Sequence, residues 1–216
     1  MKIIIKADDL AGYPGKNKII PKRWQKFVDI IKKYNIKANI GIIGNSLLFN
    51  DEGYFEWIRS NEKFIEYFNH GFLHRKFNFD GEVYEECRNT SMEYQLQLIT
   101  YTNQLAKEKL KIELISFGAP YNATDKNTSL ALNKTNIKTA YFLAEKFEGV
   151  NLKDRIDIEV PVHCPNFNEF KNSFAEKEYA VIQVHPNSWN DYYFNEFENM
   201  IKFLKDYKFI FAKEIA

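Results

Sequence analysis

Hydrophobic positions along the chain fall into two kinds of segment, which differ in the spacing of their apolar residues. Short apolar runs predict β-strands, and longer segments with apolar residues three and four positions apart predict amphipathic helices. Strands are predicted over residues 2–7, 38–43, 64–68, 112–117, 139–143, 156–162, 179–184 and 208–212. Helices are predicted over residues 22–34, 51–61, 90–109 and 124–134, and over a last segment that carries Phe194, Phe197, Ile201 and Leu204.

The order of these elements predicts the fold class. Strands and helices alternate along the chain, which is typical of an α/β fold with a parallel sheet, and about eight strand candidates suit a barrel. No linker, repeat or low-complexity segment interrupts the pattern, so residues 1–216 are expected to form one domain. A turn-rich loop is predicted at 11–15 and a polar, aromatic loop at 75–88. Thr90 and Glu93 have the spacing of a capping box at the start of the third helix.

Composition and charge narrow the possible functions. With 16% aromatic residues and a net charge of +1, the chain is expected to be a soluble globular protein without a nucleic-acid partner. No apolar run approaches the ~20 residues of a membrane helix or, near the N-terminus, the ~7–15 of a secretory signal, so a cytoplasmic protein is expected. Cys87 and Cys164 form no CxxC pair, which argues against a disulfide scaffold and a cysteine-based zinc site.

Polar side chains capable of chemistry follow the predicted strands where those strands end. The first strand contains three consecutive isoleucines and ends in Asp8 and Asp9. The chain has four histidines, each at or just past a predicted strand end: His70, His74, His163 and His185. Because parallel strands of a barrel end at the same rim, we expect these six side chains to converge. Adjacent residues of a regular strand point to opposite faces, so Asp8 and Asp9 can share a site only if the chain bends there.

His70 and His74 are four residues apart, a spacing that lets both imidazoles face one ion from a helical turn or a tight loop. A carboxylate as third ligand leaves a fourth position for water, which is the pattern of a catalytic zinc site. The pair alone is equally consistent with two unrelated polar residues in a loop. The double aspartate at another strand end favours the metal site.

Four short motifs lie in order along the chain. They are Ala7-Asp8-Asp9-Leu10, His70-Gly71-Phe72-Leu73-His74, Gly118-Ala119-Pro120-Tyr121 and Gln183-Val184-His185. Together they resemble the motifs of the polysaccharide deacetylase family, the NodB-homology carbohydrate esterases. The resemblance spans nearly the whole chain, and it implies a distorted (β/α) barrel of about seven parallel strands. It also implies metal-dependent removal of N- or O-acetyl groups from sugars.

The resemblance implies a role for each motif residue. Asp9, His70 and His74 resemble the ligands of a divalent metal, with zinc as the expected ion. A bound zinc ion lowers the pKa of water to about 7 and so makes a nucleophile available at neutral pH. The acyl oxygen that becomes negative in the reaction then needs positive charge or a hydrogen-bond donor beside it.

Three further residues resemble the catalytic groups of the family. Asp8 resembles the general base, and His185 resembles the general acid. An imidazole near its reference pKa of ~6.5 can give the proton that a leaving nitrogen requires. Tyr121 follows the motif proline, and its backbone N–H resembles the donor to the oxyanion.

The chain also departs from the family pattern. The family has an arginine that orients the base two residues before the motif proline, where this chain has Gly118. No other cation is identified as a substitute, and Arg75, next to His74, is a candidate. Gly71 stands in place of the usual serine or threonine, and Gln183 replaces an apolar residue. The family's tryptophan motif near the fourth stretch is not visible.

Three residues are assigned to substrate binding. Trp189, four residues after His185, can form a wall on which a sugar ring stacks, although an ordinary core or surface tryptophan is an equal alternative. His163 can stand beside His185 on the rim, although such a histidine is more often a packed or surface residue. Pro120, the motif proline, is placed with them.

The sequence therefore predicts a metal-dependent hydrolase that removes an acetyl group, N-acetyl in preference to O-acetyl, from a small-molecule or oligosaccharide substrate. The alternative is a catalytically degenerate protein of the same fold that binds a carbohydrate or a partner without turnover. Another metallohydrolase is a third hypothesis. An amidohydrolase typically has HxH after the first strand, and a phosphoesterase requires basic residues of which few are evident. The sequence leaves the oligomeric state open.

Overall fold

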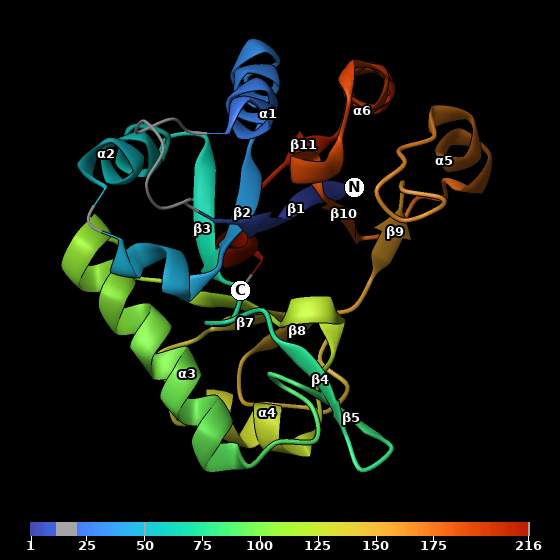
Figure 1. Ribbon diagram of the computed structural model, residues 1–216. Helices are drawn as coiled ribbons and strands as arrows, with labels where there is room; N and C mark the ends of the chain where they lie inside the picture. The colour runs from blue at the N-terminus through green and yellow to red at the C-terminus, as the bar shows by residue number, and fades with distance from the viewer. Residues whose placement is uncertain (12–20, 50, 216) are drawn as a thin grey trace.

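A computed structural model of the protein, shown in Figure 1, describes residues 1–11, 21–49 and 51–215. Eight strands form a continuous path of hydrogen-bonded neighbours in the order β8-β7-β6-β3-β2-β1-β10-β9, and every pair on it is parallel. The strands of the path are β1 (Lys2–Leu10), β2 (Ala38–Ile42), β3 (Ile65–Asn69), β6 (Ser116–Gly118), β7 (Thr139–Tyr141), β8 (Val150–Leu152), β9 (Arg155–Asp157) and β10 (Tyr179–Val184). The predicted loop at 11–15 lies, from Gly12 onward, outside the described residues.

The path nearly closes into a barrel. Its two ends, β8 and β9, follow one another in the chain, and none of the pairings among the described residues joins them. A further strand, β11 (Lys208–Phe209), pairs with the beginning of β1, whereas β2 pairs with the end of β1. The predicted α/β class and distorted barrel are therefore confirmed, with eight strands on the path where about seven were expected.

Within the described residues, six α-helices accompany the strands, and Figure 1 shows these helices arranged around the barrel. They are α1 (Lys22–Lys33), α2 (Glu52–Ser60), α3 (Met92–Leu105), α4 (Lys126–Leu132), α5 (Phe167–Ser173) and α6 (Asp191–Phe203). The predicted apolar face of α1 is buried, since Trp24, Phe27, Val28 and Ile31 all lie in the largest hydrophobic core. None of the helices in the described part of the chain is both long and apolar enough to cross a bilayer.

The side chains of β1 alternate between two environments, as the period of a strand requires. Ile3 and Ile5 lie in the large core that also contains residues of α1 and α6. Ile4 belongs instead to a cluster with Phe68 and Tyr141, which comes from strands around the barrel and fills its interior. Residues 4, 6 and 8 of β1 therefore share the inner face.

The structure corrects several predicted elements. The stretch 75–88 is not a loop but contains the antiparallel hairpin β4 (Lys76–Phe79) and β5 (Glu82–Glu85), which extends away from the barrel in Figure 1. β4 is fully exposed, so it lacks the buried face on which the sequence prediction depended. Strand β8 and helix α5 were not predicted.

Several predicted strands are shorter in the structure, including those predicted over 139–143 and 208–212, which end at Tyr141 and Phe209. Strand β6 covers only Ser116–Gly118, and β9 ends at Asp157 because the chain turns between Val160 and Cys164. The predicted capping box is wrong by one residue, since Ser91 caps α3 by accepting a hydrogen bond from the Tyr94 N–H.

Candidate metal centre and proton-transfer site

The two adjacent aspartates share one site because β1 bulges at its end. Ala7 pairs with Ile40 and Leu10 pairs with Ile42, so β1 has one residue more than β2 between these pairs. Asp9 has a φ of 72°, in the left-handed region that few residues other than glycine adopt. This bend provides the departure from strand geometry that the sequence required.

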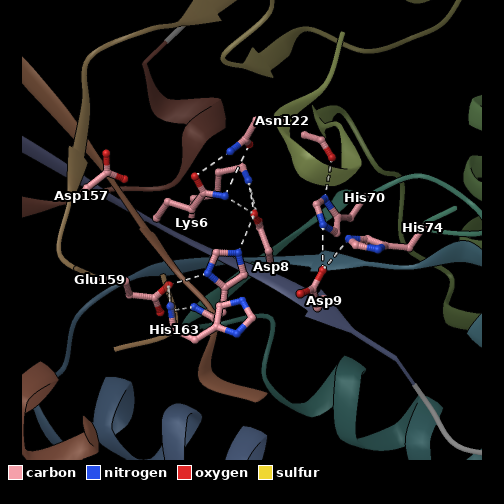
Figure 2. A network of polar contacts seen from close by, with 12 residues as sticks. Lys6, Asp8, Asp9, His70, His74, Asn122, Asp157, Glu159 and His163 are labelled. Carbon is pink, nitrogen blue, oxygen red and sulfur yellow. Dashed lines mark hydrogen bonds and ion pairs between the residues drawn. The ribbon is translucent and has the colours of Figure 1, made fainter. Parts of the chain in front are cut away.

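Figure 2 shows the result: Asp9 faces His70 and His74, whereas the carboxylate of Asp8 points toward Lys6. Asp9 Oδ1 lies 3.1 Å from His70 Nε2 and 3.0 Å from His74 Nε2. The three ligand atoms lie within 4.8 Å of one another, which is close enough to hold one ion. The predicted ligand set Asp9, His70 and His74 is thus brought together as a possible metal site.

The hydrogen bonds of His70 fit a cation at this site. His70 Nδ1 lies 2.6 Å from the carbonyl oxygen of Gly118, and because a carbonyl only accepts, Nδ1 carries the proton. In a neutral imidazole, Nε2 then presents a lone pair to the carboxylate of Asp9, and two acceptors face each other. A cation between them, or a second proton on His70, removes that conflict. Ligating histidines commonly have such a backbone partner, which fixes the tautomer.

The loop that carries His74 is held by a buried carboxylate from the far side of the hairpin. Glu86 is 3% exposed and accepts the backbone N–H groups of Phe72, Leu73 and His74, the last at 2.8 Å. Three successive N–H groups around one anion form a nest, which fixes the backbone and hence the position of His74. Gly71 makes room for this contact, because a Cβ there would lie 2.8 Å from Glu86 Oε1.

The charges of the cluster favour a bound cation. Burial acts to raise the pKa of Asp9, but the hydrogen bonds from His70 and His74 outweigh it, and the pKa of Asp9 is well below its ordinary value. Burial acts to lower the pKa of His74, and the hydrogen bond and charge of Asp9 reverse this effect, so the pKa of His74 is raised. An ionised carboxylate that stabilises positive charge around it is the environment that a divalent cation requires.

Asp8 lies in a separate polar cluster on the inner face of the barrel. Lys6 Nζ donates to Asp8 Oδ1 at 2.6 Å and to Oδ2 at 2.5 Å, and Gln183 Nε2 donates to Oδ2 at 2.6 Å. Asn122 in turn donates to Gln183 Oε1 at 2.9 Å. A carboxylate has about four lone-pair positions, so these three hydrogen bonds leave one position of Asp8 free to accept a proton.

The same contacts set the ionisation of Asp8. Burial acts to raise its pKa, and the charge of Lys6, followed by those of His70 and His185, overcomes this and lowers the pKa of Asp8. Burial in turn lowers the pKa of Lys6, which the carboxylate of Asp8 partly offsets. Asp8 is therefore an ionised carboxylate, as a general base must be.

His185 follows β10 and is oriented by a buried carboxylate. Glu159 Oε2 lies 2.6 Å from His185 Nδ1, and Glu159 Oε1 accepts the backbone N–H of His185 at 2.7 Å and the Trp189 indole N–H at 2.9 Å. His185 Nε2 then faces Asp8 Oδ2 across 3.9 Å. Burial acts to lower the pKa of His185, but the hydrogen bond to Glu159 outweighs it and raises the pKa, which favours the protonated form.

Other predicted site residues lie at the same rim. Tyr121 packs its ring against that of His74, with centroids 4.5 Å apart, and its phenol donates to the His74 carbonyl at 3.0 Å. The ring of His163, which is exposed, lies 4.8 Å from that of His185. The expectation that His163 stands beside His185 is met, while its role in substrate binding stays a prediction.

Three predictions are wrong. Trp189 is completely buried against Phe27, Phe194 and Phe197, so its ring offers no wall to a sugar. Pro120 is buried against the Gly71 loop and is likewise a packing residue. Arg75 is exposed, and its guanidinium lies 4.9 Å from the ring centre of Phe77 on the hairpin, so it does not substitute for the missing arginine.

Sequence reasoning missed three residues that support the site: Lys6, Glu86 and Glu159. For Lys6 there was a signal, because it stands two residues before Asp8 in the same strand and must therefore lie on the same face. Glu159 lies within a predicted strand and Glu86 lies within a predicted loop. In neither case did the surrounding sequence point to the site.

No model of a known protein family matches the sequence, and no curated protein matches it. Solved structures with the same fold do exist. A CE4 family pseudoenzyme from Bacillus anthracis has a TM-score of 0.70 at 14% identity, and the match covers 98% of this chain and 64% of that one. The chain therefore spans less than two thirds of the length of that protein.

Two further matches cover more of the other chain. A family 4 acetyl xylan esterase from Clostridium thermocellum, in complex with a cobalt ion, has a TM-score of 0.69 at 14% identity, with 100% of this chain and 90% of that one covered. The peptidoglycan deacetylase PdaC from Bacillus subtilis has a TM-score of 0.66 at 16% identity, with 99% and 88% covered. At these identities the likeness shows that this chain has the fold of CE4 proteins.

Proposed function

We propose that the protein is a metal-dependent hydrolase that removes an acetyl group, N-acetyl in preference to O-acetyl, from a sugar or a related amide. One observation carries the proposal: the side chains of a metal site, Asp9, His70 and His74, adjoin a base and an acid, Asp8 and His185, 3.9 Å apart. The fold shared with an acetyl xylan esterase and a peptidoglycan deacetylase supports the same reaction class.

Asp9, His70 and His74 would hold the cation, and zinc is the ion we propose, because two imidazoles and a carboxylate suit it. When bound, such an ion supplies Lewis acidity and lowers the pKa of water at the site to about 7. The chain itself keeps the ligands ready, since Gly118 fixes the tautomer of His70 and Glu86 fixes the loop of His74.

The remaining residues move protons and hold charge. Asp8 accepts a proton from the attacking water through its free lone-pair position, while the water oxygen bonds to the acyl carbon. The backbone N–H of Tyr121 is proposed to donate to the acyl oxygen as that oxygen becomes negative. His185 then donates a proton from Nε2 to the leaving nitrogen, and the C–N bond breaks to give acetate and the amine.

The orientation of His185 supports the proposed preference for an amide substrate. An amine leaves as a neutral molecule only if its nitrogen is protonated, whereas an alkoxide from an ester leaves more readily without help. Glu159 raises the pKa of His185 and fixes its Nδ1, so the other ring nitrogen faces the site with a proton to give. This device has most effect on the cleavage of a C–N bond.

A second function has an observation of its own in favour. Asp8 is 2% exposed and already accepts three hydrogen bonds, which limits its access to a water molecule. One of the structures with this fold is a pseudoenzyme. A protein that binds an acetylated carbohydrate without turnover is therefore the alternative.

The experiment is a measurement of acetate release. The purified protein is stripped of metal with a chelator, reloaded with zinc, and incubated with N-acetylglucosamine oligomers, acetylated xylan and simple acetamides. We expect zinc-dependent acetate release from the amides, faster than from the esters, and none from His74→Ala. Binding of an acetylated sugar by the zinc-loaded protein without acetate release would establish the alternative, and zinc-independent hydrolysis would refute both.

A further inference from the structure

We propose that Lys6 is the positioning residue that holds the carboxylate of Asp8, and that Gly118 belongs to the same device because it leaves the space that Lys6 fills. The inference rests on the proposed function, in which Asp8 is the general base. The proposed cation, Lys6, lies on β1. The motif on β6 has no cation, because Gly118 stands at the position of the family's arginine.

Lys6 occupies an improbable place for a lysine. Its side chain is completely buried, on the inner face of the barrel between Ile4 and Asp8. Its ammonium lies over the rings of Phe68, Tyr141 and Phe142, at 5.4, 5.5 and 5.6 Å from their centres. An ammonium in an apolar interior is costly unless it is paired, and cation–π contacts return only part of that cost.

The partner that compensates Lys6 is Asp8. Lys6 Nζ contacts both oxygens of the carboxylate, at 2.6 and 2.5 Å. The ammonium therefore restrains the rotation of the carboxylate and also stabilises its negative charge. Gln183, which stands opposite Lys6 in the pairing of β1 with β10, adds a third hydrogen bond from the other side. The one lone-pair position that remains free is therefore fixed in direction.

Gly118 completes the device because a side chain there would collide with Lys6. A Cβ on Gly118 would lie 2.9 Å from Lys6 Cε and 2.9 Å from Phe68 Cε2, closer than a Cβ contact normally allows. A long side chain starting from that Cβ would enter the same space as the end of Lys6. A cationic side chain can therefore reach Asp8 from position 6 or from position 118, but not from both. In this chain it comes from position 6.

A buried ion pair that only stabilises the fold is the competing explanation, because removal of one partner of such a pair is costly in any protein. The two explanations differ in what happens to turnover when the protein stays folded. A positioning role requires that kcat falls while KM and zinc affinity change little. The metal ligands make none of the hydrogen bonds to Lys6, so zinc affinity is an internal control.

The first test compares Lys6→Met with the wild-type protein. We expect kcat for the acetylated substrate to fall about 10²-fold, the loss that a misplacement of about 1 Å can cause, with unchanged KM and zinc affinity. Lys37→Met is the control, because Lys37 pairs with Glu214 at 2.8 Å elsewhere and should keep full activity. A folded, zinc-binding Lys6→Met protein with wild-type kcat would overturn the proposal.

The second test moves the charge to the other origin. In Lys6→Ala the space of the lysine side chain is free and, of the two closest contacts, only the ring of Phe68 has to shift, so the added substitution Gly118→Arg should raise kcat above that of Lys6→Ala alone. In the wild-type background, Gly118→Arg should lower kcat because it collides with Lys6. A substitution that harms one background and helps the other indicates a shared position for the charge. Harm of equal size in both backgrounds, with both proteins folded, would refute it.

A third measurement separates this inference from the proposed function. If the wild-type protein releases no acetate, the proposed function fails, but the pairing of Lys6 with Asp8 is still tested by thermal unfolding. The double variant Lys6→Met/Asp8→Asn should melt above Lys6→Met, because it removes the buried charge that the single variant leaves without its cation. This measurement also applies if Lys6→Met alone is too unstable for kinetics. A double variant that melts no higher would show that Lys6 does not hold Asp8.

Discussion

The two halves of the site differ in how closely they follow the motif residues. In the metal half, Asp9, His70 and His74 meet as the motifs predicted, and the supporting groups are a backbone carbonyl and the carboxylate of Glu86. In the proton-transfer half, the two motif residues Asp8 and His185 are also present. Of their supporting groups, Gln183 belongs to a motif, whereas Lys6 and Glu159 come from positions outside the motifs.

The difference has a physical cause. His70 and His74 are neighbours in the sequence and meet through local geometry, whereas Asp9 reaches them from another strand, 61 positions earlier, with the help of a bulge. A charged side chain that supports another residue only has to reach that residue. It can therefore belong to any strand that faces the same space. We infer that the positions of the metal ligands are constrained in sequence, whereas the groups that support the ligands, the acid and the base can start from other positions.

The largest effect is expected in the metal half. His74→Ala removes one of three ligands, so we expect zinc affinity and acetate release to be lost together, by more than the roughly 10–100-fold that loss of a supporting residue costs. Calorimetric titration with zinc and an acetate assay measure the two effects. His163→Ala is the matched control for zinc affinity, since His163 lies at the same rim and contacts His185. Full zinc affinity in His74→Ala would break the assignment of the ligands.

A smaller effect, confined to turnover, is expected in the other half. His185→Ala should lower kcat by about 10²–10⁴-fold, the usual contribution of a general acid, and should leave zinc affinity unchanged. The same two assays measure it. The comparison predicts that kcat can be lost without loss of zinc affinity. A His185→Ala protein that no longer binds zinc would contradict it.

The support of the metal half can be tested with two adjacent glutamates. Glu86→Gln leaves only one oxygen for three backbone N–H groups, so the loop of His74 loosens, and zinc affinity should fall roughly 10–100-fold. Glu85→Gln is the control: Glu85 is 2% exposed against 3% for Glu86, but its side chain pairs with Lys76 and Arg88. Equal losses in the two variants would mean that the hairpin matters only for stability.

The smallest expected effect is a shift in pH dependence. The acid must be protonated, so kcat/KM falls as the pH rises through the pKa of His185, which Glu159 raises. In Glu159→Gln that pKa drops, and the alkaline fall of kcat/KM should move to lower pH. A pH–rate profile of the two proteins measures this, with the exposed Glu178→Gln as control. An alkaline limb that stays in place would exclude His185 as the group observed.

The sequence indicated the fold where apolar runs were buried on both faces, as in β1, β2 and β10. It missed the hairpin β4 and β5, because the alternation of Phe77 and Phe79 with polar residues covers only four residues and has no buried face. It also made β9 too long, since alternation continues past Asp157 into a segment that turns. These errors share one cause: strand pairing is decided by distant neighbours that a local pattern does not contain.

The site shows the same division. The convergence of Asp8, Asp9 and the histidines was predicted from strand ends alone, because a parallel barrel gathers those ends at one rim. Trp189 was misplaced because its burial depends on Phe27, in a helix distant in the sequence, as well as on Phe197 in the helix that follows it. Lys6 was overlooked although its two-residue spacing from Asp8 placed both on one face of the strand.

The central claim is that Asp9, His70 and His74 hold one divalent cation beside Asp8 and His185. Crystals of the zinc-loaded protein, measured at wavelengths on both sides of the zinc absorption edge, test it directly. We predict a single anomalous peak about 2.0–2.2 Å from Asp9 Oδ1, His70 Nε2 and His74 Nε2, the usual distances of zinc ligands. An absence of that peak in crystals grown with excess zinc, or a peak on other residues, would contradict the account.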